Sequence, residues 1–408
     1  MNRVRQVVAW VQAGSLYVLL FLLPFSKAAV EIGFGGLLLS WLFARLDPKT
    51  RADSLWVKPA LRPVLFAGAG FLAACAMSAV VSTDVVLSMK GLINKWLEYL
   101  LFVVIVADVA SRKDVWQRSF MTLAASAFFV VFEGITQERY GNGFFRHYRL
   151  DFFNRMTGPY ENPIDLATYF MVIIPPLMAY TFLQRGGRRW RYVGLMLAIS
   201  ACLARTLSLG AWISLWISLA VMSCWRTPAR RYALTSLVLV PVIAGAFLLG
   251  SGRLTRAFSM SDIGKQDRLA MWQTAIHMIK DRPILGQGVN TFMANYLTYW
   301  VGGQRQPRYA HNCYLQVAAE TGLVGLISFL WFLGLLGALL VDRLTRLQAV
   351  SEGQLLIGLF TGLLAFAIQA AVDTNFYSLR QAALFWVLTG VAISLGMQRG
   401  HRGEAARG

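Results

Sequence analysis

One short segment of the chain combines the residue types of a proton-transfer site. The segment RYAHNCYLQVAAETGLVG, residues 308–325, holds one of only four histidines in 408 residues. A neutral imidazole can accept a proton near neutral pH, so His311 is a candidate general base for a hydroxyl group. Asn312, Tyr314 and Gln316 follow it and carry polar groups that can orient the imidazole or a hydroxyl-bearing ligand. From the residues alone, a histidine with a purely structural role is the alternative.

The rest of the sequence offers no metal site. Glycosyl- and phosphoryl-transfer sites that use a divalent metal usually have closely spaced acidic ligands, and no D-x-D or E-x-D occurs here. The four cysteines lack the spacing of zinc ligands, and neither G-x-S-x-G nor a nucleotide-binding glycine loop is present. We therefore expect no metal and no cofactor. His147 and His277 are interpreted as structural.

Arginines supply a second set of candidates. Arg205 stands almost alone between two apolar runs, 192–204 and 206–225, where a charge is costly without a partner. Arg155, in NRMTGPYENP, precedes the next apolar run upstream and can converge with Arg205. The planar guanidinium fork binds phosphate oxygens in pairs, so these residues are candidates for holding an anionic ligand such as a diphosphate. Contact with lipid headgroups is the simpler alternative.

The elements that must position these residues are membrane-spanning helices. The chain is 57% hydrophobic and 14% charged, with a mean hydropathy of +0.53. A helix needs about 20 apolar residues to cross the hydrocarbon core. Eight runs of at least 18 residues lack Asp, Glu, Lys and Arg: 6–26, 63–83, 166–184, 206–225, 232–252, 321–341, 353–372 and 381–398. Runs near 28–44, 96–110, 119–135 and 192–204 add four. The prediction is an all-α polytopic membrane protein with about 12 transmembrane helices in a single domain, 1–408.

The distribution of positive charge predicts the orientation. Short cytoplasmic loops are enriched in Lys and Arg, and QRGGRRWR (184–191) and WRTPARR (225–231) are the clearest such loops. With both termini cytoplasmic, 22 of the 39 Lys and Arg residues lie inside. The large outer loop 251–313 still carries eight of them against three Asp. Excess positive charge on the outer face favours a strongly anionic ligand there.

The loop 251–313 is predicted to contain an amphipathic helix at 267–283. Leu269, Trp272, Ile276 and Ile279 fall on one helical stripe, and Pro283 ends the helix. Such a helix beside membrane spans is expected to lie along the bilayer surface. Its Arg268 borders the apolar stripe at about headgroup depth.

At this point a family resemblance becomes visible. GQGVNTF followed by HNCYLQVAAETGLVGL resembles the signature of the O-antigen ligase and polymerase superfamily, a glycine-rich turn before H-N-x-Y-L and E-x-G-x-x-G. RMTGPYENP is similar to the superfamily's R-x-x-G-x-x-x-N-P element, and RLAMWQTAIHMIKDRPILGQG to its arginine-led loop helix. The resemblance covers roughly residues 154–170 and 265–330.

The resemblance implies a function. Such enzymes are metal-independent, inverting glycosyltransferases of the GT-C type, which move a glycan from undecaprenyl diphosphate to an acceptor on the periplasmic face of the bacterial inner membrane. His311 matches the motif histidine, the general base or acceptor-orienting residue, while Arg268 and Arg155 match arginines that hold diphosphate. The superfamily arginine after the seventh span is Leu209 here. Arg205, one helical turn earlier if the helix continues, is the candidate replacement.

Within the superfamily the motif match favours an O-antigen ligase. The donor is then undecaprenyl-diphosphate-linked O-antigen and the acceptor lipid A–core, with membrane lipids as surroundings and no nucleic acid partner. An O-antigen polymerase or a protein O-oligosaccharyltransferase is the alternative, although the latter tend to carry a larger outer domain. A lipid-linked glycan flippase is less favoured, because 184–191 is a short central connection and the long loop is outside.

Overall fold

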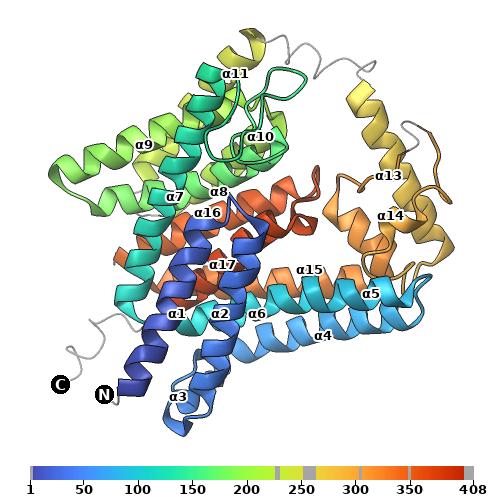
Figure 1. The fold of residues 1–408 in the computed structure, drawn as a ribbon, viewed down its shortest axis with the longest axis horizontal. Helices are drawn as coiled ribbons and strands as arrows, with labels where there is room; N and C mark the ends of the chain where they lie inside the picture. The colour runs from blue at the N-terminus through green and yellow to red at the C-terminus, as the bar shows by residue number, and fades with distance from the viewer. Residues whose placement is uncertain (1–2, 226–229, 251–262, 303–305, 348–350, 399–408) are drawn as a thin grey trace.

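The protein is built from helices. The computed structural model describes residues 3–225, 230–250, 263–302, 306–347 and 351–398, and within these ranges it has no β-strand, only an isolated bridge between Asn142 and Arg149 (Figure 1). The α-helices are α1 (Arg3–Leu22), α2 (Lys27–Arg45), α3 (Pro48–Ala52), α4 (Arg62–Val80), α5 (Val85–Gly91), α6 (Glu98–Val109), α7 (Lys113–Tyr140), α8 (Pro163–Leu183), α9 (Gly186–Arg205), α10 (Leu209–Ser223), α11 (Arg230–Gly250), α13 (Ile263–Asp281), α14 (Phe292–Asn295), α15 (Cys313–Leu347), α16 (Ser351–Gln369) and α17 (Leu379–Gly396). A π-helical turn, Leu92–Leu97, joins α5 to α6, and short 3-10 helices lie at Leu55–Val57, Pro59–Leu61 and Asn375–Tyr377.

The predicted membrane spans correspond to helices of this structure. Eight helices of the described chain are long and apolar enough to cross a membrane: α1, α2, α4, α7, α8, α15, α16 and α17. The prediction of an all-α polytopic membrane protein is confirmed. The other four predicted spans are the helices α6, α9, α10 and α11, which are shorter or carry more charge. The number 12 therefore stays a prediction.

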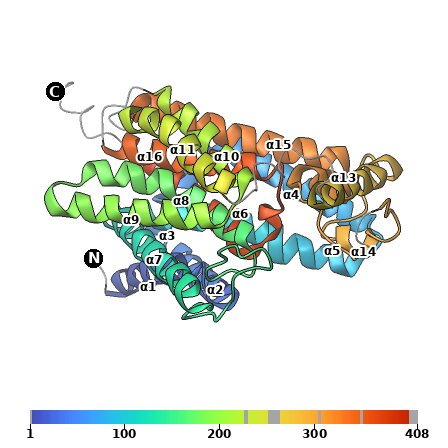
Figure 2. The same cartoon turned by 90° about the horizontal axis from the view of Figure 1, so that it is seen from above.

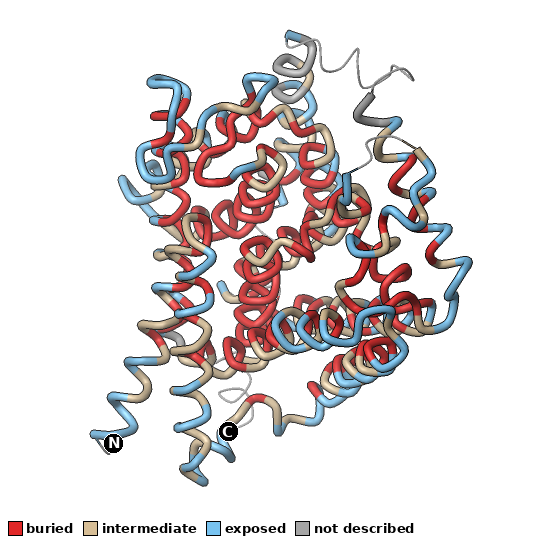
Figure 3. The backbone as a smooth tube through the Cα atoms, turned by 45° about the vertical axis from the view of Figure 1, so that its right-hand side comes forward, coloured by how far each residue is buried: buried red, intermediate tan, exposed pale blue. Residues whose placement is uncertain are grey.

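Two of the spans form the centre of the molecule. α8 packs against α16, and α17 packs against α6. The pairs α1–α2 and α15–α4 also pack together, and these four helices are less buried than α8 and α17. The buried backbone in Figure 3 is concentrated in the central helices, and α8 and α17 are the most enclosed spans. α8 begins where Asn162 Oδ1 accepts the backbone N–H of Ile164 at 2.8 Å, with Pro163 in the first helical position. This cap fixes the point at which the chain enters the core.

Both described ends of the chain lie at the same end of the bundle. Gln398, just after α17, donates to the carbonyl of Ser111, at the start of the connection into α7. At the other end, Arg380 near the start of α17 donates to the carbonyls of Pro24 and Pro159 at 2.7 and 3.0 Å. A helix of 20 residues such as α1 is about 30 Å long, so these two ends are separated by roughly a bilayer thickness. We call the end with Arg380 the His311 end, because His311 also lies there.

The helix predicted at 267–283 is present as α13, which ends at Asp281. Figures 1 and 2 both place α13 and α14 at one extremity of the molecule, beside α5. The side chains that pack inward are Met271, Ala275 and Met278, which form a small cluster with Phe292 and Tyr296. Of the predicted apolar stripe, Leu269 and Ile276 are 50% and 39% exposed, whereas Ile279 packs against this cluster. The protein thus covers part of the stripe, and burial of Leu269 and Ile276 in the bilayer surface stays a prediction.

Candidate functional site

His311 is held in a constrained backbone conformation directly before α15. Its φ is 47°, in the left-handed region that non-glycine residues rarely adopt. The next residue, Asn312, caps the helix because its Oδ1 accepts the backbone N–H groups of Tyr314 and Leu315, each at 3.0 Å. The Cys313 N–H donates to the carbonyls of Ala370 and Asp373. These contacts fix the position of the imidazole relative to the connection after α16.

A carboxylate lies beside the imidazole. The Nδ1 atom of His311 is 3.5 Å from Oδ1 of Asp373, and the Asp373 side chain is 7% exposed. The two atoms are within ion-pair distance, and Nδ1 makes no hydrogen bond to a described residue. A carboxylate at Nδ1 keeps the proton on that nitrogen, which leaves Nε2 as the basic atom. The pair thus has the arrangement of a general base and the group that orients it, at a distance that can shorten when substrate binds.

The pair opens into a cavity of about 340 Å³, which we call the His311 cavity. It is about half polar in character and is formed by the start of α8, the segment before α15 and the segment between α16 and α17. Its lining residues are Asn162, Asp165, Met293, Pro307, Arg308, Tyr309, His311, Asp373, Thr374, Tyr377 and Ser378. The lining contains one arginine, Arg308. Burial raises the pKa of the neighbouring Tyr309 phenol, so this phenol stays protonated at neutral pH.

Tyr314 and Gln316 support the site from below rather than facing the cavity. The Tyr314 hydroxyl donates to the carbonyl of Ala367 on α16 at 2.7 Å. The Gln316 side chain is fully buried, accepts the backbone N–H of Ala310 at 3.2 Å and donates to Glu320 at 3.2 Å. Gln316 therefore holds the backbone immediately before His311, which is an indirect way of orienting the imidazole.

The glycine-rich turn 286–291 packs across a break in α15. Gly322 has a φ of 67° inside the helix, and a Cβ there would collide with the carbonyl of Ile284. The break exposes backbone groups that the turn satisfies: Gln287 and Gly288 donate to the carbonyls of Ala319 and Glu320 at 3.0 and 2.9 Å. The two family-like motifs are thus one structural unit, in which E-x-G supplies the break and G-x-G the backbone that fills it.

Arg155 and Arg205 come together on neighbouring loops at the same end. The backbone N–H of Met156 donates to the Arg205 carbonyl at 3.1 Å, and Arg155 Nε donates to the Thr206 carbonyl at 2.7 Å. The Arg205 guanidinium is paired with Glu138 through two contacts of 2.5 and 3.1 Å. The segments that carry the two arginines are therefore adjacent, and neither residue lines the His311 cavity.

The helix that contains Arg205 does not extend to position 209, where the superfamily arginine is expected. α9 ends at Arg205 and α10 begins at Leu209, with Leu207 between them at a φ of 51°. A helical turn does not connect the two positions, so they do not share a face. Any substitution of function by Arg205 has to come from the loop geometry.

Arg268 lies near the start of α13 and is partly exposed. It does not line the His311 cavity, and no hydrogen bond or ion pair joins its guanidinium to another described residue. Burial raises the pKa of Tyr296, and the charges of Arg308 and Asp267 also act on this phenol. Asp267 precedes Arg268 in the sequence, so charge from α13 acts on this phenol together with that of Arg308.

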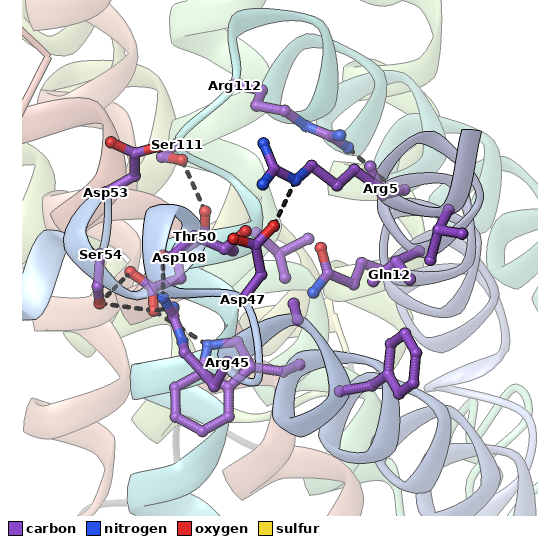
Figure 4. Close-up of a pocket in the computed structure, with 17 residues that line it drawn as sticks. Arg5, Gln12, Arg45, Asp47, Thr50, Asp53, Ser54, Asp108, Ser111 and Arg112 are labelled. Atoms are coloured by element: carbon purple, nitrogen blue, oxygen red, sulfur yellow. Dashed lines mark hydrogen bonds and ion pairs between the residues drawn. The ribbon is translucent and has the colours of Figure 1, made fainter. Parts of the chain in front are cut away.

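A larger cavity, of about 430 Å³, lies at the opposite end of the bundle (Figure 4). Its arginines are engaged within the protein. Arg5 pairs with Asp47, Arg45 pairs with Asp108, and Arg112 donates to the carbonyl of Ala9 at 3.1 Å. Figure 4 shows these groups directed at one another. This cavity brings no histidine to its lining and is not the candidate site.

One family model matches part of the chain. The family model described as O-Antigen ligase matches residues 177–330, from within α8 to beyond the break in α15. A search of curated proteins finds no match. The matched segment contains Arg205, Arg268 and His311, while Asp373 and Tyr377 lie after it. The chain is thus a multi-pass helical membrane protein with a histidine–carboxylate pair at one end of its bundle. Over residues 177–330 the chain is similar to the O-antigen ligase family.

Sequence reasoning did not identify Asp373 as a site residue. The signal was available in AVDTNF, where an acidic residue separates two apolar runs near a predicted outer surface. Asp165, two residues after the end of RMTGPYENP, was not identified either, and it lines the same cavity. Arg308 was counted among the charges of the loop but not assigned to the site. Acidic and basic residues at span ends were the informative signal.

Proposed function

We propose that the protein is an O-antigen ligase that transfers O-antigen from undecaprenyl diphosphate to lipid A–core. One observation carries the proposal: His311, with Asp373 at its Nδ1, lines a cavity together with Arg308 at one end of the bundle. A histidine base and a positively charged wall are the two features that transfer from a diphosphate to a hydroxyl requires. The similarity of residues 177–330 to the O-antigen ligase family supports a lipid-linked glycan as donor.

In the proposed reaction, His311 Nε2 takes the proton of an acceptor hydroxyl while the hydroxyl oxygen bonds to the anomeric carbon of the donor sugar. The bond from that carbon to the diphosphate oxygen breaks, and undecaprenyl diphosphate leaves with the electron pair. A single displacement of this kind inverts the configuration at the anomeric carbon. Asp373 stabilises the imidazolium that forms. No metal and no cofactor takes part in this scheme.

Arginines are proposed to stabilise the leaving diphosphate. Positive charge placed where negative charge develops is commonly the largest single contribution to such a reaction. Arg308 faces the cavity and Arg268 lies near the start of α13, and these two are proposed to contact the diphosphate directly. Arg155 and Arg205 are proposed to hold the donor from the neighbouring loops. Arg205 would share its guanidinium between Glu138 and the phosphate.

We further propose that the protein lies in the bacterial inner membrane, with the His311 end in the periplasm and both termini in the cytoplasm. The common end of Arg3 and Gln398 supports an even number of crossings. The Lys- and Arg-rich loops 184–191 and 225–231 support the cytoplasmic assignment of that end. In this orientation the loop 251–313 is periplasmic.

Deletion of the gene followed by examination of lipopolysaccharide and lipid-linked glycans tests the function. A ligase predicts full-length O-antigen that remains on undecaprenyl diphosphate, with uncapped lipid A–core. Single repeat units on lipid A–core would indicate a polymerase instead, and loss of protein glycosylation with normal lipopolysaccharide would indicate a protein O-oligosaccharyltransferase. Complementation with the wild-type chain and with His311→Ala separates loss of chemistry from loss of the protein.

A further inference from the structure

Four side chains and one backbone group form a closed set of contacts beneath the His311 cavity. Lys95 Nζ donates to Asn290 Oδ1 at 2.8 Å, and the Asn290 backbone N–H donates to Glu320 Oε2 at 2.7 Å. The Tyr377 hydroxyl donates to the same Glu320 oxygen at 3.1 Å. Lys95 Nζ then lies 4.7 Å from the centre of the Tyr377 ring, which closes the set. We call these four residues the Lys95 ring.

The Lys95 ring joins four separate parts of the chain. Asn290 belongs to the glycine-rich turn, and Glu320 to the E-x-G motif at the break in α15. Tyr377 lines the His311 cavity, with the Tyr309 ring centre 5.8 Å from its own. Lys95 comes from outside the family-matched segment 177–330 and, like Glu320, touches both the turn and the cavity wall.

Lys95 is presented by an unusual piece of backbone. It lies in the π-helical turn Leu92–Leu97, and π-helical turns are rare and are often found at functional sites. The residue before this turn, Gly91, packs so closely on Asn290 that a Cβ there would collide with the Asn290 side chain. The wider turn therefore lets the Lys95 side chain reach the ring while the glycine-rich turn lies directly on the helix.

The hydrogen bonds of Glu320 show which contacts of the Lys95 ring depend on Lys95. Glu320 is 1% exposed, and its carboxylate accepts from Asn290, Gln316 and Tyr377. The carboxylate is thus hydrogen-bonded without Lys95. The ammonium contacts the other two members, the Asn290 amide and the Tyr377 ring face, to which a cation is attracted by the ring quadrupole. Lys95 is therefore placed to fix the relative position of turn and cavity wall.

We propose that Lys95 is a positioning residue of the transfer site, which locks Tyr377 and the turn 286–291 in the geometry that the His311–Asp373 pair requires. The expected effect of Lys95 on kcat rests on the proposed function. Its expected effect on the mobility of Tyr377 and of the turn 286–291 rests on the structure alone. The competing explanation is that Lys95 only balances the charge of Glu320.

Three variants separate these explanations. Lys95→Met removes the ammonium, and Lys95→Met/Glu320→Gln removes both charges so that none is left unbalanced. Lys90→Met is the matched control, because Lys90 lies on α5 one and a half turns earlier and is exposed. Purified full-length proteins are compared in three measurements: thermal unfolding, hydrogen–deuterium exchange of peptides covering 286–292 and 374–378, and kcat and KM for transfer from undecaprenyl-diphosphate-linked O-antigen to lipid A–core.

Positioning predicts faster exchange in both peptides and a kcat lowered by about tenfold or more in Lys95→Met, with KM for donor little changed. The double variant should recover thermal stability but not kcat, and Lys90→Met should match wild type throughout. Recovery of wild-type kcat in the double variant, or unchanged exchange in Lys95→Met, overturns the proposal. If Lys95→Met does not fold, peptide exchange and kcat of the double variant are compared with those of the wild type. Unchanged exchange or wild-type kcat in the double variant then overturns the proposal. If wild type itself transfers nothing, the proposed function fails, while the exchange measurement still tests the lock.

Discussion

Asp373 should act on catalysis only through His311, and this makes a quantitative prediction. Asp373→Asn keeps the size of the side chain and removes the charge that faces His311 Nδ1 at 3.5 Å. A hydrogen bond to a charged group contributes about 1.5–3 kcal/mol once its geometry tightens in the substrate complex. Because 1.36 kcal/mol corresponds to a factor of ten in rate, kcat should fall by about 10- to 150-fold. His311→Ala removes the base itself and should cost about 10²–10⁴-fold.

The decisive form of this experiment is the double variant. If Asp373 acts through the imidazole, His311→Ala/Asp373→Asn should be no slower than His311→Ala alone, since there is no base left to orient. The assay is transfer by purified protein from undecaprenyl-diphosphate-linked glycan to lipid A–core, with kcat measured at saturating donor. His277→Ala, at an exposed position on α13, is the control and should remain active. Losses that multiply in the double variant would refute the reasoning, and so would substantial activity in His311→Gln.

Three further predictions follow from the metal-free scheme, the orientation and the break in α15. Transfer should continue in excess EDTA, and its loss with rescue by magnesium or manganese would contradict the arginine scheme. In a Cys224→Ser background, which removes the exposed native cysteine, a cysteine at Gln273 should react with an impermeant maleimide on intact spheroplasts and one at Gly187 should not; the opposite pattern would invert the orientation. Gly322→Ala should destabilise the protein by at least about 1–2 kcal/mol, because it puts a Cβ at positive φ against the Ile284 carbonyl. Gly334→Ala, in open space on the same helix, should be neutral or slightly stabilising in thermal unfolding.

The helices could be predicted from the sequence because a membrane span is a local property. An uncharged run of sufficient length fixes a helix regardless of its neighbours, and all twelve predicted runs overlap helices of the structure. The apolar run 96–110 is shorter than the helical stretch that the structure shows there. It is the second half of a helical stretch that begins at Val85, and the charges of Lys90 and Lys95 interrupt its apolar pattern. The charge of Lys95 lowers the mean hydropathy of this stretch. In the structure its ammonium contacts the Asn290 amide and the Tyr377 ring.

The candidate site could be predicted only where its residues are close in sequence. His311 and its cap Asn312 are adjacent, and the turn 286–291 precedes them in one motif. Asp373 is 62 positions after His311, and it is brought there by the antiparallel return of α16 along α15. No local pattern encodes that pairing. The same applies to Tyr377, whose ring meets Lys95 across 282 positions.

The roles expected for Tyr314 and Gln316 illustrate a second limit. The sequence places polar groups near the imidazole, and three-dimensional structure decides which way they point. Tyr314 turns to α16 and Gln316 into the core, because positions three and five residues after His311 fall on the buried faces of α15. Their effect on the imidazole passes through the backbone of Ala310 and the packing of α15 on α16.

Reconstitution of the reaction with purified components tests the central claim most directly. The full-length protein is placed in lipid nanodiscs with undecaprenyl-diphosphate-linked O-antigen and lipid A–core, without divalent metal, and the products are analysed by mass spectrometry and by nuclear magnetic resonance of the new linkage. The account predicts capped lipid A–core, one undecaprenyl diphosphate released per glycan transferred, inversion at the anomeric carbon, and loss of all three with His311→Ala. Longer glycans that remain on undecaprenyl diphosphate, retention of configuration, or undiminished transfer by His311→Ala would contradict it.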